Sequence, residues 1–210
     1  DGAVNLTVNG SCNISKVYQA VKGVELNTIT GPHPAGNVGI QIHHINPVNK
    51  GEVVWHINPQ DVLIIGRLFT KGIFDASRTI AVTGSEILKP QYYKTIIGAS
   101  IKLFTSNNIT NGHLRYISGN PLTGIKISKD GFLGFYHNQI TVIPEGNDYE
   151  MFGWALPGFK KFSTSRTFLS GFFAKKQFNI NANLHGGIRP FVFTGEYEKV
   201  LPMDIYPVYL

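Results

Sequence analysis

The sequence contains little cysteine and little charge. Cys12 is the only cysteine among the 210 residues, so no disulfide can form within the chain. One thiol is also too few to build a cysteine-ligated zinc site or an iron–sulfur cluster. Charged residues make up 15% of the chain, whereas about 25% is usual. We therefore expect a reduced, cytoplasmic compartment and a protein that does not depend on disulfides.

Long apolar runs and common cofactor motifs are also missing from the sequence. No stretch of about 18 apolar residues is present, so no membrane-spanning helix is expected. The chain has no P-loop, no G-x-G-x-x-G and no G-x-S-x-G, which gives no sign of a nucleotide-binding loop or a serine nucleophile. The start at Asp1, with neither a methionine nor a signal peptide, suggests a fragment.

Glycine and aromatic residues are abundant. The chain has 23 glycines, 14 phenylalanines and 9 tyrosines, and 42% of its residues are hydrophobic. A packed core with short strands and many turns is expected, and disorder is not.

The net charge of +6 is unevenly placed. Between residues 151 and 195 there is no Asp or Glu, and the same stretch is rich in phenylalanine. Its cations are Lys160, Lys161, Arg166, Lys175, Lys176 and Arg189. A basic, aromatic surface suits an anionic or interfacial partner, such as single-stranded nucleic acid, a membrane, or the cytoplasmic side of a membrane protein.

The first part of the chain has an α/β pattern. A strand at 3–8, a short helix at 16–22 capped by Ser15, and a strand at 24–30 predict a parallel pair of strands. A second helix is predicted over 59–71, because Asn58 suits its N-cap, proline suits its first position, and Gly72 ends it.

The pattern changes at Arg78. A hairpin formed by 78–84 and 93–99, a short helix at 100–107 capped by Ser100, and strands at 113–119, 123–128 and 139–146 follow the order of a β-grasp domain. Beyond it, the stretch 163–176 is predicted to be helical.

These patterns predict an α+β fold in three parts. Residues 1–77 form an α/β segment, and residues 78–147 form a β-grasp domain. Residues 148–210 form a mixed C-terminal segment that is basic and rich in phenylalanine.

Three histidines raise the possibility of a metal site between residues 33 and 44. His33, His43 and His44 could serve a histidine-metal hydrolase. In an extended segment, however, His43 and His44 would point to opposite faces, and no carboxylate lies between Glu25 and Glu52. A loop stiffened by proline and glycine explains the stretch better, and no metal or catalytic residue is assigned.

Several long motifs resemble one protein family. They include GPHPAG (31–36), VVWHINPQDV (53–62), ISGNPLTG (117–124), FLGFYHNQITVIPEG (132–146), MFGWALPG (151–158), KFSTSRTFL (161–169) and YEKVLPMDIYP (197–207). In this order they resemble the C-terminal half of the A subunit of the sodium-translocating NADH:quinone oxidoreductase. The resemblance implies that residues 1–77 are a partial, Rossmann-like α/β domain and that the β-grasp domain of residues 78–147 is of the soluble-ligand-binding type.

That resemblance implies a peripheral protein on the cytoplasmic face of the bacterial inner membrane. The complex of that family oxidises NADH, reduces quinone and exports sodium, while its flavins and iron–sulfur cluster belong to partner subunits. This chain would then bind no cofactor of its own, would be inactive alone, and would not bind nucleic acid. Quinone-binding candidates are His33, Trp154 and Arg166, and the candidates for docking on membrane subunits are Lys160, Lys161, Lys175 and Lys176.

Overall fold

The computed structural model describes residues 2–163, 166–173, 177–183, 195 and 197–207. The chain divides into two compact units, one formed by 1–57 with 189–210 and the other by 58–188. Each unit is described by itself below. The predicted boundaries after residues 77 and 147 stay a prediction.

The first unit begins with a small parallel sheet. Strand β1 (Asn5–Asn9) pairs with β2 (Glu25–Ile29), and the short helix α1 (Lys16–Gln19) connects them. Ser15 caps α1 as predicted, because its hydroxyl oxygen accepts a hydrogen bond from the backbone N–H of Val17 at 3.4 Å. The predicted strand–helix–strand order and the parallel pairing are therefore confirmed, although the helix is shorter than the predicted range.

A helix that the sequence pattern did not predict follows in the same unit. Helix α2 (Val38–Ile45) begins after Asn37, which is extended, and Ile40 is its buried residue. The loop prediction is right for residues 31–37 and wrong for 38–45. Val38, Ile42 and Ile45 have helical spacing, so one apolar face of α2 was present in the sequence but was not used.

The second unit opens with the most regular helix of the chain. Helix α3 (Pro59–Lys71) follows the extended Asn58, has proline in its first turn, and ends at Gly72 in the left-handed conformation. Glycine adopts that conformation without a steric penalty, which is why it ends helices well. The predicted range 59–71 is confirmed.

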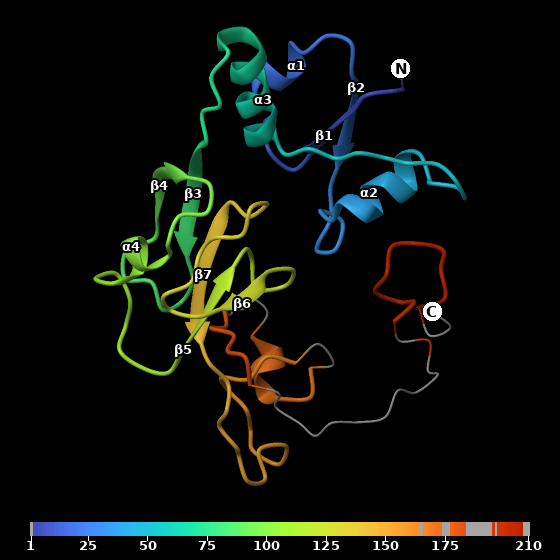
Figure 1. Ribbon diagram of the computed structural model, residues 1–210. Coiled ribbons are helices and arrows are strands. Elements are labelled where there is room, and N and C mark those ends of the chain that lie inside the picture. The colour runs from blue at the N-terminus through green and yellow to red at the C-terminus, as the bar shows by residue number, and fades with distance from the viewer. Residues whose placement is uncertain (1, 164–165, 174–176, 184–194, 196, 208–210) are drawn as a thin grey trace. The chain divides into compact units, whose positions relative to one another are not determined.

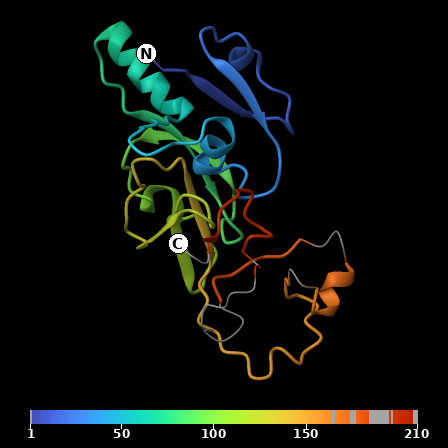
Figure 2. The same ribbon diagram turned by 90° about the vertical axis from the view of Figure 1, so that its right-hand side faces the viewer.

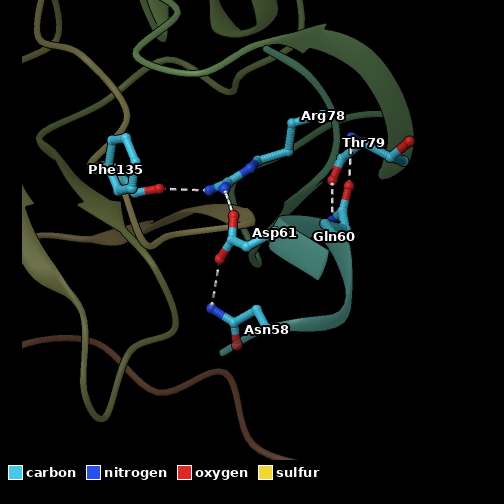
Figure 3. A network of polar contacts seen from close by, with 6 residues as sticks. All are labelled: Asn58, Gln60, Asp61, Arg78, Thr79 and Phe135. Atoms are coloured by element: carbon cyan, nitrogen blue, oxygen red, sulfur yellow. Dashed lines mark hydrogen bonds and ion pairs between the residues drawn. The ribbon is translucent and has the colours of Figure 1, made fainter. Parts of the chain in front are cut away.

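A polar network joins the first turn of α3 to strand β3 (Ser77–Thr83), as Figure 3 shows. The side chain of Gln60 donates to the carbonyl of Thr79 at 2.9 Å and accepts from its N–H at 2.8 Å. The Arg78 guanidinium forms an ion pair with Asp61 and donates to the carbonyl of Phe135 at 2.5 Å. Helix and strand are therefore held together by backbone-directed hydrogen bonds and by a buried ion pair.

Five strands form the main sheet of this unit (Figure 1). They are β3, β4 (Gln91–Ile96), β5 (Leu114–Ser118), β6 (Ile125–Ile127) and β7 (Gln139–Pro144), in the order β4-β3-β7-β5-β6. Strands β3 and β7 run parallel, and the other neighbours are antiparallel. The predicted hairpin of β3 and β4 is confirmed, as are the three later strands.

Alternating side chains of β3 and β7, together with residues of the connecting segments, build the core. Its buried residues are Ile80, Val82, Ile87, Ile101, Leu133, Ile140 and Val142. Helix α4 (Lys102–Thr105) contributes Phe104, which packs against this core. The N-cap of α4 is Ile101 and not the predicted Ser100, because the buried Ile101 begins the turn from inside the core. The α+β class and the β-grasp order of elements are confirmed.

Beyond β7 the described chain has little regular structure. Its only described element is a 3-10 helix, Leu169–Phe172, so the helix predicted over 163–176 is wrong for the residues that the structure describes. Gly171 and the β-branched and hydroxyl residues before it have low helix propensity, which explains why a single short turn forms.

Candidate partner-docking surface

Residues 148–183, called here the aromatic lobe, leave the end of β7 and return to it (Figures 1 and 2). Two hydrogen bonds close the lobe at its base. The N–H of Ala182 donates to the carbonyl of Pro144 at 3.2 Å, and the side-chain amide of Asn183 donates to the carbonyl of Asp148 at 2.7 Å. The lobe is therefore a closed excursion from the sheet and not a loose tail.

Lys161 holds the middle of the lobe together. Its ammonium group forms an ion pair with Glu150 and donates to the carbonyl of Gly153 at 2.9 Å. The same group lies 5.4 Å from the ring centroid of Phe168, and the Lys161 carbonyl accepts a hydrogen bond from the hydroxyl of Ser170. One side chain thus joins the two halves of the lobe.

The backbone around Leu169, in the second half of the lobe, packs against the backbone around Pro157, in its first half. The N–H of Leu169 donates to the carbonyl of Pro157 at 3.0 Å. Gly158 has a φ of 62°, and a Cβ atom at this position would lie 2.4 Å from Cδ1 of Phe168. Glycine is required here for two reasons, the left-handed backbone and the ring that lies against it.

Two bulky residues of the lobe have left-handed backbones without being glycine. Phe152 has a φ of 55° and Arg166 has a φ of 56°. This conformation costs an L-residue about 1–2 kcal/mol, so surrounding contacts must hold it in place. Non-glycine residues in strained conformations concentrate at functional sites, which makes the positions of both side chains relevant to function.

Many large apolar side chains of the lobe are exposed to solvent. Large apolar side chains that remain exposed are Tyr149, Met151, Phe152, Trp154, Leu156, Phe159, Phe162, Leu169, Phe172, Phe173 and Ile180. Single exposed apolar residues are normal on protein surfaces, but a concentration of them marks an interaction site. Residues 48–74 expose twelve such side chains, so apolar exposure alone does not distinguish the lobe. The lobe is a candidate docking surface because it combines this exposure with the absence of Asp and Glu from its residues after Glu150.

The structure places the four predicted docking lysines differently. Lys160 is exposed in the lobe, whereas Lys161 is partly buried and its charge is compensated by Glu150. Lys175 and Lys176 lie outside the described residues. Docking by these lysines stays a prediction, and Lys160 is the described lysine whose position suits it best.

The three quinone-binding candidates do not form one cluster within either unit. Trp154 and Arg166 are exposed residues of the lobe, in the second unit. His33 is exposed in the loop before α2, in the first unit. Quinone binding by these residues stays a prediction.

The histidines proposed for a metal site have other positions. His43 and His44 lie next to each other on α2 with their rings edge to face, 5.3 Å apart. Nε2 of His44 lies 2.6 Å from the carbonyl of Pro202, which joins the C-terminal stretch to this unit. No group of three His, Cys, Asp or Glu residues that could hold a metal ion occurs in the described part of the chain.

A small hollow lies between α3 and the β3–β4 hairpin. Its volume is about 90 Å³, and its lining residues include Leu63, Arg67 and Lys94. Sites for small organic molecules are usually about 300–1,000 Å³. The hollow is therefore too small for a quinone head group or a flavin.

Sequence reasoning missed the contacts that organise the lobe. Glu150 lies just before the stretch that lacks acidic residues, and its pairing with Lys161 spans eleven positions. The excess of aromatic residues and the absence of acidic ones were the signals available from the sequence, and both pointed to this region.

Comparisons with known proteins assign the family. Residues 1–74 match the model of the NqrA second alpha/beta domain, and residues 79–129 match that of the NQRA C-terminal domain. Together these ranges cover more than half of the chain.

Curated relatives agree with these domain matches. The chain is 43% identical to the A subunit of the Na(+)-translocating NADH-quinone reductase of Yersinia pseudotuberculosis over 188 residues. This aligned region is 89% of the chain and 42% of the relative. The corresponding protein of Pasteurella multocida is 41% identical over 201 residues, 95% of the chain and 45% of the relative. That of Haemophilus influenzae is 44% identical over 192 residues, 90% of the chain and 42% of the relative.

Two domain models of one family, matched in order along the chain, define the class of protein. The chain belongs to the NqrA family, the A subunits of the Na(+)-translocating NADH-quinone reductase. The chain spans less than half the length of these relatives. None of the helices in the described part of the chain has the length and hydropathy to cross a bilayer.

Proposed function

We propose that this chain is a non-catalytic, peripheral part of a sodium-translocating NADH:quinone oxidoreductase, and that it docks through the aromatic lobe on the membrane subunits of the complex. The observation that carries the proposal is the lobe itself, a closed excursion with eleven exposed large apolar side chains. Membership of the NqrA family supplies the complex in which such a surface would be used.

The charge of the lobe suits the cytoplasmic face of a bacterial membrane. Anionic lipid headgroups of that face attract cations, whereas the excess Lys and Arg of cytoplasmic loops would repel them, so headgroups and acidic side chains of the membrane subunits are the natural partners of Lys160. Lys161 contributes to docking indirectly, by holding the lobe in shape through Glu150. Flavins and the iron–sulfur cluster would reside in other subunits, and this chain would bind no cofactor.

Crosslinking within the complete complex tests the docking proposal. An amine-reactive crosslinker should join Lys160 to a membrane subunit, while Lys129, an exposed lysine of the β-grasp part, serves as the comparison. A complex in which Lys129 is crosslinked to membrane subunits and Lys160 is not would contradict docking through the lobe.

Quinone contact is a second, finer part of the proposal. Trp154 and Arg166 lie in the lobe, where an indole and a guanidinium could face a quinone ring and its carbonyl oxygens. His33 lies in the other unit and is tested separately. Alanine at each position, followed by quinone binding to the isolated protein, decides the matter: unchanged binding in all three variants excludes the assignment.

A further inference from the structure

The chemistry of the lobe points to lipid as well as to protein. Its most exposed apolar side chains include Met151, Trp154 and Phe172, with 83%, 78% and 82% of their surface accessible. Tryptophan and other aromatic residues favour the headgroup level of a bilayer, where the ring meets acyl chains and the polar edge stays wet.

Charge complementarity favours an anionic surface. No Asp or Glu occurs between residues 151 and 195, and the Glu150 carboxylate is already paired with Lys161. Lys160 and Arg166 remain exposed in the same stretch of the chain. A bacterial membrane that contains anionic lipid attracts each such cation, whereas the buried centre of a protein interface is usually poor in lysine.

The backbone of the lobe is suited to shallow insertion. Turns such as the one from Phe152 to Ala155, closed by a 2.9 Å hydrogen bond, satisfy part of its backbone internally. Phe152 is held in a left-handed conformation at this turn, and its ring is exposed. In the described part of the lobe the only regular element is the 3-10 helix Leu169–Phe172, so no strand edge is present there to pair with a peptide.

We propose that exposed apolar side chains of the aromatic lobe, among them Met151, Trp154 and Phe172, insert into the interface of an anionic lipid bilayer, with Lys160 and Arg166 at the headgroups. This inference rests on the proposed function, because docking in the complex brings the lobe to the membrane. It goes further in assigning Met151, Trp154 and Phe172 to lipid, and it leaves the other exposed apolar side chains of the lobe to the membrane subunits.

Tryptophan fluorescence tests the inference directly, because the chain has two tryptophans, Trp55 and Trp154, in different units. Trp55→Phe leaves Trp154 as the single reporter, and Trp154→Phe leaves Trp55, which is 89% exposed. Each variant is titrated with vesicles of phosphatidylcholine alone or with about one-third phosphatidylglycerol. With the anionic vesicles, the emission of Trp154 should shift to shorter wavelength and be quenched by brominated acyl chains, while that of Trp55 should change little.

Cosedimentation with the same vesicles measures the affinity of each variant for the two kinds of vesicle. Binding should be on the order of tenfold tighter to the anionic vesicles, because each cation near such a surface contributes about 1 kcal/mol. Combining Trp154→Ala with Phe172→Ala should reduce binding at least about fivefold, as expected from losing two inserted rings. The control Tyr92→Ala removes an equally exposed ring from β4 and should leave binding unchanged.

Two results would overturn the inference: an emission of Trp154 that stays the same on anionic vesicles, or equal losses in the lobe variant and in Tyr92→Ala. Circular dichroism of each variant establishes that it is folded before vesicles are added. If Lys160 crosslinks to a membrane subunit in the complex but vesicles leave Trp154 unchanged, the lipid inference fails and docking stands. If vesicles shift Trp154 and crosslinking fails, docking is wrong and lipid binding stands.

Discussion

Arg115 on β5 donates two hydrogen bonds to a single carboxylate oxygen of Glu145, which directly follows β7. The distances to Oε1 are 2.8 Å from Nε and 2.5 Å from Nη2, and Nζ of Lys126 on β6 reaches the other oxygen at 2.6 Å. Glu145 is buried, and it thereby joins three neighbouring strands close to the base of the lobe. The Arg115 guanidinium lowers the pKa of Glu145 to about 2 although burial acts in the opposite direction.

The stability of the protein should therefore depend on pH through Glu145. A carboxyl group whose pKa is lowered on folding stabilises the folded state above its ordinary pKa of 4.5, and this contribution is lost as pH falls towards 2. Glu145→Gln removes the charge that Arg115 and Lys126 contact, so it should lower the free energy of unfolding at pH 7 by about 1–2 kcal/mol. The loss is no larger because solvent screens the exposed Lys126. Urea unfolding between pH 7 and 2 measures both the effect of Glu145→Gln at pH 7 and the pH dependence of the free energy of unfolding.

The matched control for this prediction is Glu25→Gln, an exposed carboxylate on β2. It should leave the free energy of unfolding unchanged at pH 7. If the wild type and Glu145→Gln lose stability in parallel as pH falls from 5 to 2, the assignment to Glu145 is wrong.

The buried ion pair of Asp61 and Arg78 makes a second prediction. The Arg78 side chain is 1% exposed, so Asp61→Asn leaves an uncompensated cation in the interior. Breaking a buried pair on one side costs about 3–5 kcal/mol, and replacing both partners with apolar residues costs much less. Asp61→Asn should show this loss in urea unfolding, and Asp61→Leu combined with Arg78→Met should recover much of it.

A nearby exposed pair provides the comparison for Asp61. Arg67 and Asp75 lie 2.9 Å apart with side chains 37% and 42% exposed, so solvent screens the pair and Asp75→Asn should lower the free energy of unfolding much less than Asp61→Asn does. Equal losses for Asp61→Asn and Asp75→Asn would show that burial of the Arg78 pair contributes nothing.

Local signals in the sequence predicted the elements whose causes are local. Asn58, Pro59 and Gly72 define both ends of α3 because capping depends on adjacent residues. Alternating apolar residues predicted β3 and β7 for the same reason. Helix α2 was missed because the nearby glycines and prolines outweighed a short apolar face in the pattern.

The candidate site depends on contacts between distant residues, so the sequence predicted it only in part. Composition identified the aromatic, basic stretch. It could not show that Lys161 would pair with Glu150, or that Ala182 would return to Pro144 and close the lobe. These partners are set by the path of the chain, to which periodicity and capping give no guide.

The left-handed backbone of Phe152 makes a third prediction. Glycine adopts a φ of 55° without strain, whereas alanine at this position keeps the strain and loses the ring. Phe152→Gly should therefore be more stable than Phe152→Ala by about 1 kcal/mol, which is opposite to the usual order of the two residues. Phe162, whose φ is not positive, should show the usual order, with Phe162→Gly less stable than Phe162→Ala. The rate of limited proteolysis within the lobe, compared among the four variants, provides the measurement, and the same order at both positions would contradict the strain at Phe152.

A substitution at Gly158 makes a fourth prediction, that the lobe can open while the core of the sheet stays folded. Gly158→Ala places a Cβ atom against the ring of Phe168 and forces alanine into a left-handed backbone. The contact between Leu169 and Pro157 should open, while the core around Ile80 and Val142 lies elsewhere and stays intact. Limited proteolysis should then cut within the lobe several-fold faster, with little change in the urea midpoint of the whole protein, because local opening costs less than global unfolding. Adding Phe168→Ala removes the clash but keeps the backbone strain, so protection should return in part. Cleavage of Gly158→Ala at the wild-type rate would mean that this approach of Gly158 to Phe168 does not hold the lobe closed.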